Sequence, residues 1–161
     1  EDGNGVVIPI EIKIRKGTGS VSTTINNVDM LAGAQDSIRT AVKVAQSFTG
    51  FNLKSKDIEV TFQNILPEIV QIDGSSAGAA ITVTLIAVIR NNTIDDKVMM
   101  TGTIENDGTI GPIGSVQKKA EAARAAGAII FLVPVGQKVN VSGIQIIEVN
   151  GIENVVGIVL K

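Results

Sequence analysis

The chain has 161 residues and a formal net charge of −2; 44% of its residues are apolar and 19% are charged. These values fit one folded domain, because domains contain roughly 100–200 residues and disordered chains are poorer in apolar side chains. The sequence contains no His, no Cys and no run of basic residues, which excludes a Ser/His/Asp triad, a cysteine nucleophile and the common zinc sites, and argues against nucleic acid as a partner.

The first half of the chain alternates between strand and helix patterns. Residues Val6–Ile14 alternate apolar and polar side chains, which predicts a half-buried strand. After a turn at 17–19, we expect Ser20–Thr24 to return as the hairpin partner of that strand. The helical period of Ala34–Phe48 predicts an amphipathic helix that packs on the sheet. Asp57–Phe62 alternates again and predicts a short strand.

The second half contains two predicted helices of different character. Ala77–Arg90 is apolar nearly all round, which is typical of a helix buried on most sides. An alanine-rich helix follows, with Ser115 as a favoured N-cap and Gly127 as the stop. The other predicted elements are strands at Lys97–Thr103, Ala128–Val133 and Ile144–Val149, a tight turn at 106–108 and a terminal helix at Ile152–Leu160. The patterns predict an α/β (α+β) fold with a mixed sheet and packed helices, as one domain over residues 1–161.

The missing residue types restrict the chemistry further. Without imidazole or thiol, a catalytic hydroxyl must be activated by another group, and the sequence predicts no metal and no cofactor. The absence of Trp and Tyr, with only four Phe, largely excludes stacking platforms for bases or sugars. The longest apolar stretch, Ala77–Ile89, is shorter than the roughly 20 residues that span a bilayer. No leader pattern follows Glu1, so we expect a mature product or a piece of a longer chain; the compartment stays open between the cytoplasm, a membrane and outside the cytoplasm.

Ser76 lies in the sequence DGSSAG, at the N-terminus of the predicted buried helix. A serine there exposes its hydroxyl group, and free backbone N–H groups and the helix dipole favour a bound oxyanion. Two other interpretations stay open. The serine is also a favoured helix cap, and a Gly-rich loop that enters a helix can bind phosphate.

Lys119 lies on the predicted alanine-rich helix. At 100° per residue it falls beside Ala123 on the strip of small apolar side chains, whereas Lys118 points away. We therefore expect Lys119 to point inward, with Asp73 or Glu121 as a partner in three dimensions. A lysine that snorkels at the edge of the strip is the alternative.

Ser76 and Lys119 together suit covalent acyl transfer without histidine. A neutral lysine amine can remove the serine proton if burial lowers the lysine pKa from about 10.4 to about 7–8. Thr101, at the end of the preceding predicted strand, is a candidate to orient the amine. The two residues therefore predict a Ser-Lys catalytic pair.

Three motifs, in this order, resemble the proteolytic domain of Lon-type proteases. The similarity extends over most of the chain, and the serine-to-lysine spacing matches that of the family without a gap. The resemblance implies that Ser76 is the nucleophile, Lys119 the general base and Thr101 the hydroxyl that holds the lysine, with backbone N–H groups around Gly74 to Ser76 as the oxyanion hole. The motifs are Asp73-Gly74-Ser75-Ser76-Ala77-Gly78, Met100-Thr101-Gly102, and Gly108-x-x-x-Pro112-Ile113-Gly114 followed by Lys119.

Two positions depart from the family pattern. Ser75 stands where many members have Pro, and Thr103 where many have an acidic residue. Neither position supplies the catalytic pair. Because Ser75 also carries a hydroxyl group, the choice of Ser76 as the nucleophile rests on the resemblance.

The resemblance also implies substrates and an assembly. Peptides or already unfolded proteins would be cleaved, by a homo-oligomer of the hexameric-ring type. Neither Gly17-x-Gly19-Ser20 nor Gly136-Gln137-Lys138 completes a phosphate-binding loop, so we expect no ATPase module in this chain. The sequence is similar to archaeal Lon-like proteins that lack an attached ATPase, and membrane association is expected only through segments outside this chain.

The sequence therefore predicts a serine endopeptidase with a Ser-Lys dyad. Two alternatives belong to other classes. One is a catalytically inactive module of the same fold that serves assembly or binding. The other is a phosphate-binding domain that uses the Gly-rich helix N-terminus.

Overall fold

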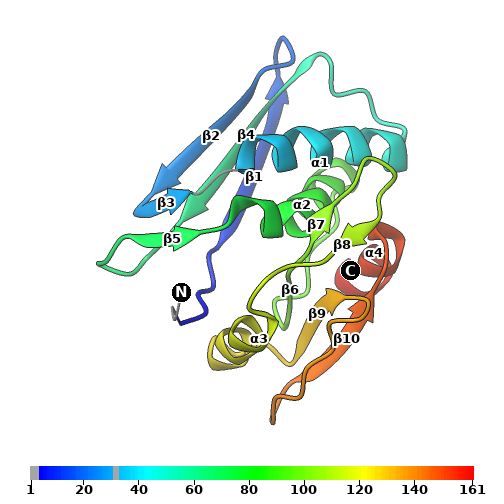
Figure 1. Ribbon diagram of the computed structural model, residues 1–161. Coiled ribbons are helices and arrows are strands. Elements are labelled where there is room, and N and C mark those ends of the chain that lie inside the picture. The colour runs from blue at the N-terminus through cyan, green and yellow to red at the C-terminus, as the bar shows by residue number, and fades with distance from the viewer. Residues whose placement is uncertain (1–3, 31–32) are drawn as a thin grey trace.

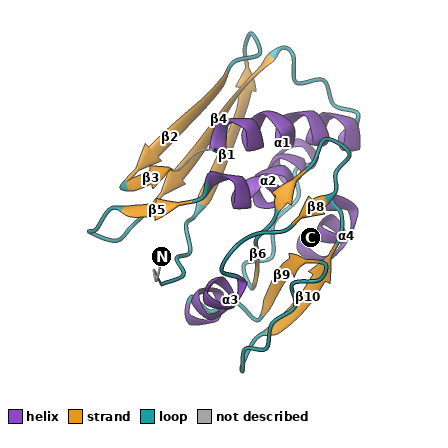
Figure 2. Cartoon of the chain, viewed as in Figure 1, coloured by secondary structure: helices purple, strands orange, loops and turns teal. Residues whose placement is uncertain are grey.

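The computed structural model describes residues 4–30 and 33–161, in which helices pack against several small sheets (Figures 1 and 2). The predicted α/β class is confirmed. The elements are β1 (Ile10–Lys16), β2 (Val21–Asn26), β3 (Val28–Met30), α1 (Ala34–Thr49), β4 (Lys56–Gln63), β5 (Val70–Ile72), the 3-10 helix η1 (Gly74–Ala77), α2 (Gly78–Arg90), β6 (Val98–Met100), β7 (Thr103–Ile104), β8 (Ile110–Gly111), α3 (Val116–Ala125), β9 (Ile130–Pro134), β10 (Gln145–Val149) and α4 (Ile152–Val159).

The first sheet has the strand order β1-β4-β2, so the predicted hairpin between residues 20–24 and the first strand is wrong. β4 lies between the two strands, antiparallel to β1 and parallel to β2. The Asp57 carboxylate of β4 accepts hydrogen bonds from the backbone N–H groups of Thr18 (2.9 Å) and Ser20 (3.0 Å), which lower the pKa of Asp57. These bonds hold the turn in place of hairpin pairing. The predicted first strand also begins later than expected, at Ile10.

The two long helices, α1 and α2, lie side by side on this sheet and form the main hydrophobic cluster with it (Figure 1). Ile81, Leu85 and Ile86 of α2 are fully buried, as are Val60 and Phe62 of β4. Both helices were expected from the sequence and are confirmed, except that a turn of 3-10 helix precedes α2. This turn contains the predicted nucleophile.

The second sheet, of order β10-β9-β6, is parallel and covered on both faces. Successive residues of β9 point to opposite faces. Phe131 and Val133 belong to a smaller cluster with Ala120 and Ala123 of α3, whereas Leu132 belongs to the main cluster. α4 also packs on the main cluster. The sheet therefore separates α3 from the rest of the core.

The predicted strand at 97–103 is interrupted. β6 ends at Met100 and β7 begins at Thr103. The backbone N–H of Thr101 still donates to the carbonyl of Leu132 in β9, but the backbone of Gly102 bonds to Ser76 of the 3-10 helix and to Ala79 of α2 instead of a neighbouring strand. The predicted turn at 106–108 is confirmed: it joins β7 to β8, with Gly108 at a φ of 86°. β3 and β5 pair separately, in parallel. Across residues 4–30 and 33–161, no helix has the length and apolar character needed to cross a membrane.

Candidate active site

The predicted nucleophile loop connects β5 to α2. Asp73 caps the 3-10 helix: its carboxylate accepts hydrogen bonds from the backbone N–H (2.9 Å) and the hydroxyl group (2.7 Å) of Ser75. Gly74 is buried against the start of α1, where an added Cβ would lie 2.7 Å from Cα and 2.9 Å from N of Ala34. The absence of a side chain at Gly74 therefore lets the loop approach α1 closely.

Ser76 lies within the 3-10 helix and caps neither helix with its side chain. Its hydroxyl group donates a hydrogen bond to the backbone carbonyl of Asp73 (3.0 Å). Its own carbonyl oxygen accepts bonds from the backbone N–H of Gly102 (2.9 Å) and from the hydroxyl group of Thr101 (3.4 Å). The backbone N–H of Ala79 in turn donates to the carbonyl of Gly102 (3.0 Å). The serine loop is thus bound to the connection between β6 and β7.

Gly102 is part of the second motif, but the sequence did not indicate its role in the site. Its N–H holds the carbonyl of Ser76, and an added Cβ would lie 2.5 Å from a methyl carbon of Ile110. The available signal was a glycine within a predicted strand, because such a glycine often marks close backbone approach.

Lys119 is half-buried on α3, beside the fully buried Ala120 and Ala123. Burial lowers the pKa of Lys119 from its ordinary value, and the negative charge of Asp73 opposes part of that shift. Of the two carboxylates expected as partners, Asp73 is therefore the one that acts on this lysine. Glu121 instead accepts a hydrogen bond from the side chain of Gln117 (2.8 Å). Lys118 is half-buried as well, so exposure alone does not distinguish the two lysines.

Five of the six predicted site residues lie in the nucleophile loop or form a hydrogen bond with it. The sixth, Lys119, is linked to this loop through the charge of Asp73. Asp73, Gly74, Ser75, Ser76 and Thr101 lie in the nucleophile loop or bond to it. Among the described residues, no hydrogen bond joins the Lys119 amine to the hydroxyl group of Ser76 or of Thr101. The role of Thr101 in holding the lysine stays a prediction, since its hydroxyl group faces the carbonyl of Ser76.

The start of α3 also differs from expectation. Ser115 occupies the N-cap position, but its side chain makes no capping bond and its backbone is left-handed, with a φ of 56°. The segment before α3 is held by Gln137, whose side-chain amide exchanges two hydrogen bonds with the backbone of Ile113 (2.9 and 2.7 Å). A tertiary contact therefore fixes the entry to α3 in place of a local cap.

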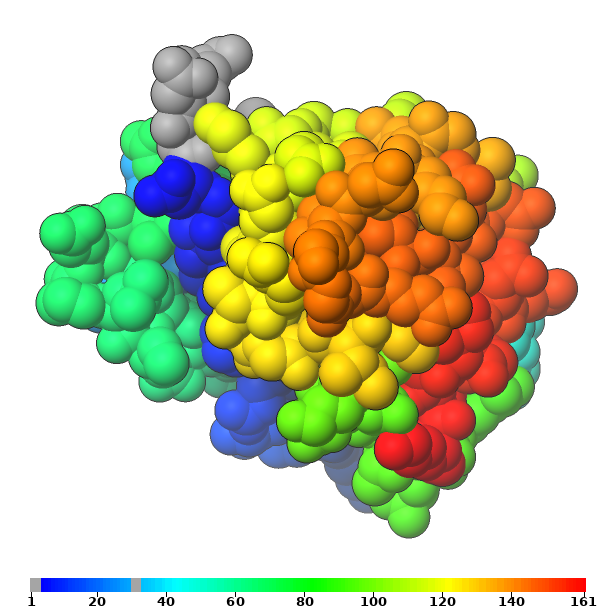
Figure 3. Space-filling view, turned by 90° about the horizontal axis from the view of Figure 1, so that it is seen from below, coloured from blue at the N-terminus to red at the C-terminus, as the bar shows by residue number. Residues whose placement is uncertain are grey.

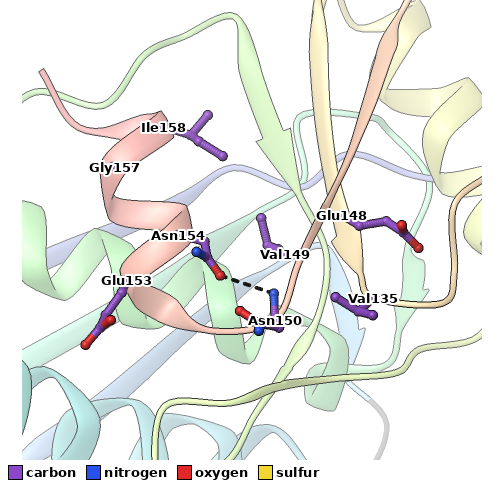
Figure 4. A pocket seen from close by; sticks show the side chains of 8 residues that line it. All are labelled: Val135, Glu148, Val149, Asn150, Glu153, Asn154, Gly157 and Ile158. Carbon is purple, nitrogen blue, oxygen red and sulfur yellow. Dashed lines mark hydrogen bonds between the residues drawn. The ribbon is translucent and has the colours of Figure 1, made fainter.

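A pocket of about 540 Å³ opens elsewhere, beside β10 and α4 (Figure 4). Its lining includes Val135, Glu148 and Ile158, and a hydrogen bond of 3.4 Å joins the backbone N–H of Asn150 to the side chain of Asn154. None of the six predicted site residues lines it. Within the described part of the chain, no group of three or more acidic side chains is placed to hold a metal ion.

Comparison with known proteins gives a consistent result. Residues 2–160 match the family described as the Lon protease (S16) C-terminal proteolytic domain. Archaeal Lon protease of Thermoplasma volcanium is 29% identical, over 97% of this chain and 25% of that protein. Lon protease 2 of Bacillus subtilis is 31% identical, over 88% of this chain and 25% of that protein.

The chain spans about a quarter of the length of these relatives. The family match covers nearly the whole chain, and it agrees with the fold. The chain therefore belongs to the Lon protease (S16) family, as a C-terminal proteolytic domain.

Proposed function

We propose that the chain is a serine endopeptidase in which Ser76 is the nucleophile and Lys119 is the general base. The observation that carries this proposal is the double role of Asp73. Its backbone carbonyl accepts the hydrogen bond of the Ser76 hydroxyl group, and its carboxylate acts on the charge of Lys119. Asp73 thus interacts with both of the groups that a Ser-Lys dyad requires.

The reaction begins with a change of hydrogen-bond partner at Ser76. The hydroxyl group leaves the Asp73 carbonyl and turns toward the amine of Lys119, which burial favours in the neutral form. As the Ser76 oxygen attacks the carbonyl carbon of a peptide bond, Lys119 accepts the proton. Lys119 then returns the proton to the leaving amine, and water hydrolyses the acyl-enzyme.

Backbone groups at the start of α2 support the oxyanion of the tetrahedral intermediate. Gly74 allows the loop to approach α1, and the dipole of α2 favours negative charge at its N-terminus. The N–H of Ser75 already donates to the Asp73 carboxylate, so this group becomes available only if that bond opens. Thr101, bonded to the carbonyl of Ser76, fixes the loop relative to β6.

The substrates of this proposed activity are peptides or proteins that are already unfolded. The chain has no phosphate-binding loop motif, so the cleavage that we propose does not consume ATP within this domain. We further propose that copies of the chain assemble into a ring, as the family resemblance implies.

Two pairs of variants test the proposal. Cleavage of an unfolded casein-like protein is measured for the chain and for Ser76→Ala, with Ser75→Ala as the control for a neighbouring hydroxyl group. Lys119→Ala is compared in the same way with Lys118→Ala. We expect Ser76→Ala and Lys119→Ala to lose cleavage, and both controls to retain it. Cleavage that survives both Ser76→Ala and Lys119→Ala would disprove the dyad.

A binding module without a competent site is the second candidate. It is favoured by the orientation of the Ser76 hydroxyl group, which bonds to Asp73 and not to Lys119. Such a module would leave the unfolded protein uncleaved while still binding it. A phosphate-binding site is disfavoured, because the Asp73 carboxylate occupies the start of the 3-10 helix and repels anions.

A further inference from the structure

Gly5 lies directly against the helix that carries Lys119. An added Cβ at this position would overlap the carbonyl oxygen of Lys118, and would lie 2.7 Å from the carbonyl carbon of Lys118 and 3.0 Å from Cβ of Ala122. The first two atoms are backbone inside α3, which cannot move aside as the end of a side chain can. Glycine therefore permits a contact between two main chains at this point.

Residues 4–9, which we call the N-terminal strap, connect this contact to the other side of the molecule. Ile8 packs on the main hydrophobic cluster, and the carbonyl of Pro9 accepts a hydrogen bond from the backbone N–H of Gln63 in β4 (3.3 Å). The strap then continues into β1 at Ile10. In Figure 3 the blue N-terminal atoms lie beside the yellow atoms of α3, and in Figure 1 the blue N-terminal ribbon runs close to α3.

The strap covers the face of α3 next to Lys119. At 100° per residue, Lys118 and Ala122 share one face of the helix, Ala120 and Ala123 face β9, and Lys119 lies between them. The Lys119 side chain therefore leaves the helix at the border between the strap and the smaller cluster.

The two residues of the proposed dyad lie on elements that pack in different hydrophobic clusters. Ser76 lies in the 3-10 helix that leads into α2, whose Ala79 and Ile81 are part of the main cluster. Lys119 is carried by α3, which packs through the smaller cluster. The separation of the two side chains thus depends on how α3 is held relative to the main cluster, and the strap contacts both.

We propose that the N-terminal strap is a positioning element of the site, and that Gly5 is a positioning residue. By allowing α3 to lie against the strap, Gly5 keeps Lys119 close to Ser76. This inference rests on the proposed function. A side chain at position 5 pushes α3 away from the strap. Lys119 then moves with the helix, and water gains access to its amine.

The test compares Gly5→Ala and Gly5→Val with Gly157→Ala. Gly157 is a matched control, because an added Cβ there meets no atom within 4 Å. We expect kcat to fall about tenfold for Gly5→Ala and about a hundredfold for Gly5→Val, since a misplacement near 1 Å can cost roughly 100-fold. KM should change little. The acid limb of the pH profile should move to higher pH, because hydration returns the Lys119 pKa toward the value of an ordinary lysine.

A second measurement does not depend on activity. Lysine side-chain NMR titration in a Ser76→Ala background should show a higher Lys119 pKa when Gly5→Val is added, and no change when Gly157→Ala is added. If Gly5→Val does not fold, Gly5→Ala decides the result. An unchanged kcat, pH profile and titration in the folded Gly5 variants would overturn the role of the strap.

The two proposals fail in different ways. If Ser76→Ala still cleaves the substrate, the proposed dyad is wrong, whatever the Gly5 variants do. If Ser76→Ala is inactive and the Gly5 variants behave like Gly157→Ala, the dyad stands and the strap proposal is wrong.

Discussion

The hydroxyl group of Ser76 and the backbone carbonyl of Asp73 are joined by a hydrogen bond of 3.0 Å. The carboxylate of the same Asp73 caps the 3-10 helix and raises the pKa of Lys119 against the opposite effect of burial. The main chain of Asp73 therefore acts on the proposed nucleophile, while its side chain acts on the proposed base.

Asp73→Asn separates these effects. Asparagine keeps the backbone carbonyl and an acceptor oxygen for the Ser75 N–H, but it removes the negative charge. Without that charge the pKa of Lys119 falls further, so the neutral base persists to lower pH. We expect the acid limb of the kcat/KM profile to move to lower pH and cleavage in mildly acidic buffer to rise severalfold. The exposed Asp96 provides a matched control as Asp96→Asn; a limb that moves equally in both variants would contradict the assignment.

Lys119→Met should raise thermal stability. Because burial lowers the folded-state pKa below that of the unfolded chain, the unfolded state binds more protons between the two values, and stability rises with pH across that range. The free-energy cost of burying the charged lysine is therefore greatest below the pKa of Lys119 in the folded state. It disappears above the pKa of an ordinary lysine, about 10.4. For a chain of this size, Tm rises by about 2–4 °C for each kcal/mol of cost removed.

The gain from Lys119→Met should be largest in neutral and acidic buffer and should vanish at strongly alkaline pH. Differential scanning calorimetry at several pH values measures it, with Lys118→Met for comparison. A Tm that is unchanged or lower near neutral pH would show that Lys119 carries no cost of burial.

Gly74→Ala should destabilise the molecule and reduce cleavage together. The added methyl group meets the backbone of Ala34 at the start of α1, so the nucleophile loop must move. Overpacking of this kind costs about 1–3 kcal/mol. Urea denaturation gives the free energy of unfolding, and Gly157→Ala, in open space within α4, should be neutral or stabilising. Wild-type stability in Gly74→Ala would mean that the loop accommodates a side chain freely.

Asn64→Ala should also lower the free energy of unfolding. The buried Asn64 amide donates to the carbonyls of Asn27 (3.1 Å) and Glu68 (2.7 Å), and its oxygen accepts from the N–H of Leu66 (3.0 Å). These bonds hold residues 64–68 against Asn27, and we expect their combined loss to cost about 1–3 kcal/mol. Within residues 4–30 and 33–161, the side chain of the exposed Asn52 bonds only to the N–H of Lys54, so Asn52→Ala should change stability by less than about 0.5 kcal/mol.

Local patterns predicted most elements correctly, because each depends on residues close together in the chain. The helical period between Ala34 and Phe48 and the alternation between Asp57 and Phe62 are examples, and both elements form. The hairpin prediction was wrong because strand pairing here depends on residues far apart in the chain. β4 enters between β1 and β2 from a distant part of the sequence, and the bonds from Thr18 and Ser20 to Asp57 exist only after it has done so.

In the site, too, features that depend on nearby residues were predicted and features that depend on tertiary contacts were not. The sequence motif places Ser76 before a buried helix, and the helical period places Lys119 beside the alanine strip; both placements agree with the structure. The hydrogen bond from Ser76 to Asp73 depends on the 3-10 turn, which no periodic pattern indicates. The contact of Gly5 with α3 joins two segments far apart in the sequence, so a lone glycine near the N-terminus gave no signal of it.

We expect the attachment of α3 to determine how the proposed activity is lost on heating. Its buried side chains against β9 are those of Ala120 and Ala123, whose methyl groups remove little apolar surface from water. We expect the amide hydrogens of α3 to exchange through a local opening that needs less free energy than global unfolding. Heat inactivation should accordingly precede melting of α1 and α2, and should reverse on cooling while the main cluster is intact.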